Sequence, residues 1–103
     1  MKRIFAKINL FSNIEGGRSQ PIPAVNFGCP VFFENIPELA NHAYDCRLLM
    51  SEYGGSISPG DCAKSVPIIF LSQDEVLLYA RVGTIFNLWE GKKIGVGEIV
   101  KIE

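Results

Sequence analysis

Residues 86–102 read Phe86-Asn87-Leu88-Trp89-Glu90-Gly91-Lys92-Lys93-Ile94-Gly95-Val96-Gly97-Glu98-Ile99-Val100-Lys101-Ile102. Two apolar runs flank a short polar segment that contains a glycine, and this arrangement is typical of two strands joined by a turn. The pattern predicts one strand over residues 84–88, a turn at 90–93 and a second strand over 94–102. The end of the chain is therefore predicted to be a β-hairpin.

Two glycines fall on the same face of the second predicted strand. Gly95 and Gly97 are separated by one residue, and glycine weakens a strand unless another group packs closely against it. We therefore expect a bulky core residue opposite them. The pair is not a dinucleotide-binding fingerprint, because that motif needs a third glycine and a following helix.

Further strands are predicted upstream of this hairpin. Residues 2–11 alternate, with Ile4, Ala6, Ile8 and Leu10 predicted to face inward. A Gly- and Pro-rich stretch over 12–23 predicts an exposed loop with at least one positive φ angle. The strand predicted over 27–35 contains Cys29-Pro30, which belongs at a sheet edge or a bulge because proline cannot donate to a ladder.

The middle of the chain continues the pattern. Residues 44–51 alternate, with Tyr44, Cys46, Leu48 and Met50 predicted to point inward. Residues 66–71 form a short apolar run that suits a buried strand.

Helical signals are weaker than strand signals throughout the chain. Residues 36–43 allow one helical turn, and residues 73–80 fit either a helix or more sheet. Six or so strands without helical crossovers predict an all-β fold, either an antiparallel barrel or a sandwich.

Length and composition limit the possible functions. The chain has 103 residues, which predicts a single domain over residues 1–103. The formal net charge of −1 gives the whole molecule no attraction for phosphate backbones. The chain shows neither a signal peptide nor a membrane-spanning apolar stretch, so we expect a soluble cytoplasmic protein that does not contact a membrane.

The sequence predicts neither a cofactor nor a catalytic site. Three widely spaced cysteines and a single histidine do not form a zinc motif, and we expect Cys29, Cys46 and Cys62 to be buried or half-buried thiols. A phosphate loop is absent, because Gly91-Lys92 is followed by another lysine instead of Ser or Thr. We therefore expect no bound nucleotide and no enzymatic activity.

Four short motifs, in this order, resemble the C-terminal β-barrel domain of bacterial translation elongation factor Tu. They are Glu15-Gly16-Gly17-Arg18 followed by Pro21, Pro30-Val31-Phe32-Phe33, Pro59-Gly60-Asp61, and the Glu90-Gly91 turn with its Ile-Gly-x-Gly-x-Ile strand. The resemblance runs from about Lys7 to Ile102. It implies a closed six-stranded antiparallel barrel with Greek-key order, and a role in binding aminoacyl-tRNA or protein partners of translation.

The resemblance also indicates the residues that would carry binding. The Glu90-Gly91 turn matches the family's approach to the T-stem of tRNA, and Arg18 matches the arginine of the first glycine loop. The candidate binding residues are Gly17, Arg18, Trp89, Glu90, Gly91, Lys92 and Lys93. For each of these a structural role stays open: a solvated turn for 90–93, a loop-stabilising side chain for Arg18, and a cap on the barrel end for Trp89.

Two functional hypotheses follow from these residues. The first is a non-catalytic binding module that holds a protein or RNA of the translation machinery, with tRNA as a possible ligand. The second is a recruited regulator or immunity-type protein that mimics the factor's surface and binds no tRNA. The second is motivated by Trp89, Val31 and Glu34, which differ from the family's usual contact residues.

Overall fold

The computed structural model describes residues 2–103 and contains six β-strands, two short α-helices and one 3-10 helix. The strands are β1 (Ile4–Leu10), β2 (Phe27–Phe33), β3 (Tyr44–Leu48), β4 (Cys62–Phe70), β5 (Ile85–Trp89) and β6 (Lys93–Ile102). The helices are η1 (Pro37–Leu39), α1 (Met50–Tyr53) and α2 (Gln73–Tyr79).

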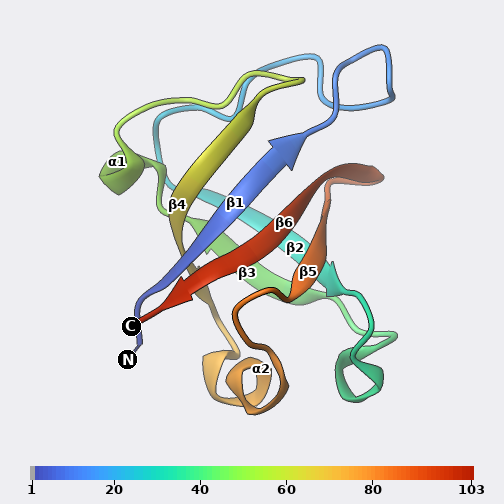
Figure 1. Cartoon of the computed structure of the whole chain (residues 1–103). Coiled ribbons are helices and arrows are strands. Elements are labelled where there is room, and N and C mark those ends of the chain that lie inside the picture. Colours follow the sequence, from blue (N-terminus) through green and yellow to red (C-terminus); the bar gives the residue numbers. More distant parts are fainter. Residues whose placement is uncertain (1) are drawn as a thin grey trace.

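The six strands close into a barrel in the order β1-β4-β3-β2-β5-β6, and every neighbouring pair is antiparallel. Strands β2, β3 and β4 form a meander, while β1 lies beside β4, which is the Greek-key order. The predicted all-β class is confirmed, and the closed barrel excludes the sandwich that the strand pattern alone also allowed (Figure 1).

Alternation along the strands fills the barrel with apolar side chains. Ile4, Ala6, Ile8 and Leu10 are all buried, as their spacing predicts. The interior also holds an aromatic cluster in which the Phe33 ring lies 5.4 Å from Phe70 and 5.9 Å from Phe86, centre to centre.

The two glycines of β6 allow close packing, as predicted. A Cβ atom at Gly97 would overlap the ring of Phe86, which lies directly opposite on β5. A Cβ atom at Gly95 would come too close to the backbone oxygen of Asn9 on β1. The bulky core residue expected from sequence is therefore found opposite Gly97, as Phe86, whereas the closest group to Gly95 is the backbone of β1.

Pro30 lies where one ladder of β2 ends. It is opposite Asp45 of β3, whose backbone oxygen accepts a hydrogen bond from Leu71 and therefore faces away from β2. The nitrogen of Pro30 accordingly points toward β5, where pairing stops at Val31 and Leu88. The proline thus occupies a local edge, as the sequence predicts, and no ladder hydrogen bond is lost.

The helical segments differ in part from the sequence prediction. The strand predicted over 44–51 ends at Leu48, and Met50 begins α1 instead of pointing inward from a strand, although its side chain is fully buried. Residues 73–80, left open between helix and sheet, form α2, which buries Gln73 and Val76 on one face. The single turn expected over 36–43 is η1.

Two further predictions need correction. Strand β4 begins at Cys62, earlier than the run at 66–71 indicated, because its first residues pair with β1. Cys62 is exposed, whereas Cys29 and Cys46 are buried, so the expectation of a buried or half-buried thiol is wrong for Cys62. Within residues 2–103, no helix has the length and apolarity needed to cross a membrane.

The barrel has two ends of different character. The loop after β1 and the β5–β6 turn lie near each other at one end, as Figure 1 shows. Helix α2, the start of β1 and the end of β6 lie at the opposite end. The candidate residues 17–18 and 89–93 therefore belong to the same end of the molecule.

Candidate functional site

The glycine loop after β1 is folded back on the strand it leaves. The Gly17 nitrogen donates to the Ser12 oxygen at 2.8 Å, and a Cβ atom at Gly17 would overlap the backbone oxygen of Phe11. Gly16, with φ of 92°, makes the turn. The carboxylate of Glu15 accepts hydrogen bonds from the Ser12 backbone and hydroxyl, which lower the pKa of Glu15.

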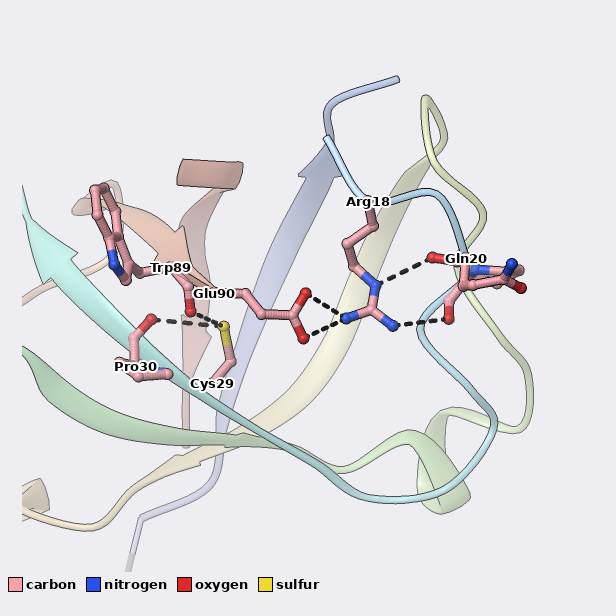
Figure 2. Close-up of polar contacts among 7 residues, drawn as sticks. Arg18, Gln20, Cys29, Pro30, Trp89 and Glu90 are labelled. Carbon is pink, nitrogen blue, oxygen red and sulfur yellow. Dashed lines mark hydrogen bonds and ion pairs between the residues drawn. The ribbon is translucent and has the colours of Figure 1, made fainter. Parts of the chain in front are cut away.

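This fold-back directs Arg18 across the barrel end to Glu90. Its Nη1 lies 2.6 Å from Glu90 Oε1 and 2.5 Å from Oε2, while Nε and Nη2 donate to the backbone oxygens of Gln20 and Pro21 (Figure 2). The guanidinium also lies 5.0 Å from the ring centre of Phe27. The Arg18 side chain is only 15% exposed, so its charge is neutralised and largely covered.

The glycine loop after β1 and the β5–β6 turn together line an open hollow of about 440 Å³. Gly17, Arg18, Glu90 and Lys92 line it together with Asn13, Ser19 and Gln20. At the rim, Lys92 has no ion pair among the described residues, in contrast to Arg18. The lining is polar and the hollow is open, so it suits contact with another molecule's surface more than enclosure of a small ligand.

Trp89 points away from this hollow. Figure 2 shows its indole and the Glu90 side chain leaving the strand end in opposite directions. The indole packs edge-on against Phe32 of β2, with ring centres 5.5 Å apart, and Trp89 stays 39% exposed. This aromatic pair lies on the outer wall of the barrel, next to the hollow but not inside it.

A thiol holds the end of β5 in place. The Cys29 Sγ donates to the backbone oxygen of Trp89 at 3.3 Å, at the position where Pro30 has no N–H to offer (Figure 2). Burial raises the pKa of Cys29 to about 11, so the thiol is protonated at neutral pH. Its role is to satisfy a carbonyl group, since a protonated, buried thiol is a poor nucleophile.

The structure brings together four of the seven predicted site residues in the hollow: Gly17, Arg18, Glu90 and Lys92. Gly91, with φ of 69°, makes the turn at its rim and has open space around it. Lys93 lies on the other side of the turn, with its Nζ 5.8 Å from the Phe11 ring centre.

The sequence analysis did not predict the lining residues Asn13, Ser19 and Gln20, the Arg18–Glu90 ion pair or the contact of Phe32 with Trp89. The ion pair joins residues 72 positions apart, and neither residue alone indicates its partner. Phe32 had a usable signal, because Val31 and Phe33 point inward and the residue between them must then place an aromatic ring on the outer wall.

Taken together, the fold and the site define a small, closed, antiparallel β-barrel protein with a polar hollow and an aromatic pair at one end. Comparison with models of known protein families found no match. A search of curated proteins found no relative either.

Proposed function

We propose that the protein is a non-catalytic binding module that contacts a protein partner through the hollow and the neighbouring Trp89. The observation that carries the proposal is the convergence of two distant segments, the Gly17–Arg18 loop and the Glu90–Lys92 turn, in one hollow. The Arg18–Glu90 ion pair joins both segments, so the surface is organised before a partner arrives.

A protein ligand fits this surface better than RNA does. Arg18 is neutralised by Glu90, which leaves Lys92 as the cation of the hollow without an ion pair in the described part of the chain. The exposed indole of Trp89 on the adjacent wall is the kind of side chain that dominates protein interfaces. Phosphate binding usually relies on several free cations.

The sequence resemblance to elongation factor Tu motivates the choice of partners. The proposed partner is a component of the translation machinery, such as the elongation factor's GTPase domain or its exchange factor, and the proposed compartment is the cytoplasm. Binding of tRNA remains a second candidate, because Arg18 and the Glu90-Gly91 turn match the family's tRNA-contacting positions.

Calorimetric titration with the GTPase domain, the exchange factor and aminoacyl-tRNA tests the proposal. We expect binding to one of the two proteins, and a loss of about tenfold or more in affinity for Trp89→Ala and Lys92→Ala. Lys101→Ala is the matched control, because Lys101 is also exposed but lies at the far end of β6. Absence of binding to all three ligands would rule the proposal out.

A competition experiment distinguishes a mimic of the elongation factor's surface from an independent binding module. A regulator that copies the factor's surface should displace the intact elongation factor from a protein that binds it. Simultaneous binding of both would favour the independent module.

A further inference from the structure

The end of the barrel opposite the hollow carries two largely exposed apolar side chains. Leu78 is 65% exposed and Val82 is 61% exposed, and both belong to α2 or the residues that follow it. We use the term α2 face for the surface formed by Asp74, Leu77, Leu78, Arg81, Val82 and Ile102. An apolar group of this kind is typical of a contact surface.

The α2 face is hollowed on both sides of Leu77. A hollow of about 610 Å³ lies on one side and includes Asp74 and Leu78 in its lining, and a hollow of about 240 Å³ lies on the other side and includes Arg81 and Val82. Lys2 and Leu77 line both hollows, so the two are adjacent. Leu77 and Lys2 therefore lie between one side that carries Asp74 and another side that carries Arg81.

The two charges that flank the centre are available for a partner. Neither Asp74 nor Arg81 takes part in an ion pair within residues 2–103. Glu103 at this end contacts Lys101 at 2.9 Å, whereas Lys2, which lines both hollows, is also without an ion pair among the described residues. Because Asp74 and Arg81 lie on opposite sides of Leu77, a two-fold rotation can bring each of them opposite the other residue of a second copy.

The buried side-chain amide of Gln73 lies at the larger hollow of the α2 face. Gln73 lines the larger hollow, is only 8% exposed and donates through Nε2 to the Lys2 backbone oxygen at 3.2 Å. Its Oε1 has no donor among the described residues. This oxygen is covered by the chain itself, so the amide holds Lys2 against α2 and presents no free acceptor at the surface.

We propose that a second copy of this chain covers the α2 face, forming a two-fold symmetric dimer. In this dimer Leu78 packs against Leu78 of the other copy, and Asp74 of each copy faces Arg81 of the other. A second copy is the occupant that the charges specify, because each copy supplies both members of the complementary pair. The interface is small, so we expect a reversible dimer that dissociates on dilution.

Sedimentation equilibrium over a wide range of protein concentration tests the proposal. We expect a monomer–dimer equilibrium for the unmodified protein and a dissociation constant at least about tenfold higher for Leu78→Asp. Ile14→Asp is the matched control, because Ile14 is fully exposed in the glycine loop at the opposite end. Circular dichroism verifies that both variants keep the fold.

Exchanging the charges provides a sharper test. Asp74→Arg and Arg81→Asp should each weaken the dimer, because each places like charges opposite one another across the axis. The double variant should restore it, since the pair is then only reversed. A protein that stays monomeric at the highest concentration, a dimer unaffected by Leu78→Asp, or a double variant no better than the single ones would overturn the proposal.

Discussion

At the scale of single residues, glycines fix how closely the strands approach. Gly97 faces the Phe86 ring so closely that a Cβ atom would overlap it, and Phe86 is itself completely buried. The ring cannot withdraw without disturbing Phe33 and Phe70, which it contacts. One hydrogen atom in place of a methyl group therefore determines the packing of the aromatic core.

Replacing Gly97 by alanine should destabilise the protein by about 1–3 kcal/mol, the usual cost of overpacking a core. Urea unfolding followed by fluorescence measures the change. Gly55→Ala is the control, because the nearest atom outside its immediate chain neighbours lies 3.9 Å from the added Cβ. Equal stability of the two variants would show that Phe86 moves without cost.

The three cysteines should differ in reactivity. Cys62 is exposed, whereas burial raises the pKa of Cys29 to about 11 and that of Cys46 as well. A thiol reagent at neutral pH should therefore label one site quickly, and Cys62→Ser should abolish that rapid phase. Rapid labelling of a second site in the folded protein would contradict the assigned burial.

The raised pKa of Cys29 also affects stability in a definite direction. Because the folded state favours the protonated thiol, this stabilisation is complete below the unfolded thiol's pKa of about 8.5. It is lost as the pH rises through the folded value of about 11. Urea unfolding should show stability falling across this alkaline range, and by a smaller amount in Cys29→Ala.

At the scale of elements, the Arg18 side chain connects the glycine loop to the β5–β6 turn. Its planar guanidinium serves Glu90 and the carbonyls of Gln20 and Pro21 at once. A lysine ammonium cannot satisfy three acceptors in this fork geometry. The position of the loop thus depends on the type of cation as well as on its charge.

Arg18→Lys should cost about 1–2 kcal/mol, because it removes hydrogen bonds to charged and backbone acceptors in a partly buried place. Urea unfolding measures this cost, and amide hydrogen exchange should show faster exchange in the loop. The control is Arg3→Lys: Arg3 pairs with Glu52 at 2.6 Å, but both side chains are about half exposed, so the expected change is near zero. Equal effects at the two sites would contradict the assigned role of Arg18.

Most strands could be predicted from sequence, and the failures have local causes. Alternation identified β1 because one face of that strand is buried throughout. The same rule wrongly placed Met50 in a strand, although Met50 enters the core from the first turn of α1. The burial of one side chain does not show whether its backbone is a strand or a helix. Helix α2 was ambiguous because its buried stripe is short.

At the scale of the whole molecule, closure of the barrel created contacts that no local pattern contains. The Arg18–Glu90 pair exists because the first loop and the last turn meet at one end. The sequence supplied both candidates separately, but their mutual neutralisation became visible only in the closed barrel. Closure therefore pairs Arg18 with Glu90, so Lys92 and Trp89 are more available than Arg18 for contact with a partner.

Closure is also uneven around the barrel. The ladder between β1 and β6 runs from Ile4↔Ile102 to Leu10↔Gly95, whereas β2 and β5 pair only from Val31↔Leu88 to Phe33↔Phe86. Outside this short seam, Phe32 and Trp89 form the aromatic pair. The β2–β5 seam is thus one of the two shortest in the barrel, together with β3–β4, which pairs only from Cys46↔Phe70 to Leu48↔Ile68. The β2–β5 seam lies beneath the candidate contact surface.

Native-state hydrogen exchange at low denaturant should reveal this asymmetry. Amides bonded across the β2–β5 seam should exchange through a partial opening of lower free energy than amides between β1 and β6. Phe32→Ala removes the outer aromatic contact and should lower protection at the seam while leaving β1–β6 nearly unchanged. A partner that docks on Trp89 should raise protection there, because it stabilises the closed seam. One common opening free energy for all strands would instead show that the barrel unfolds only as a unit.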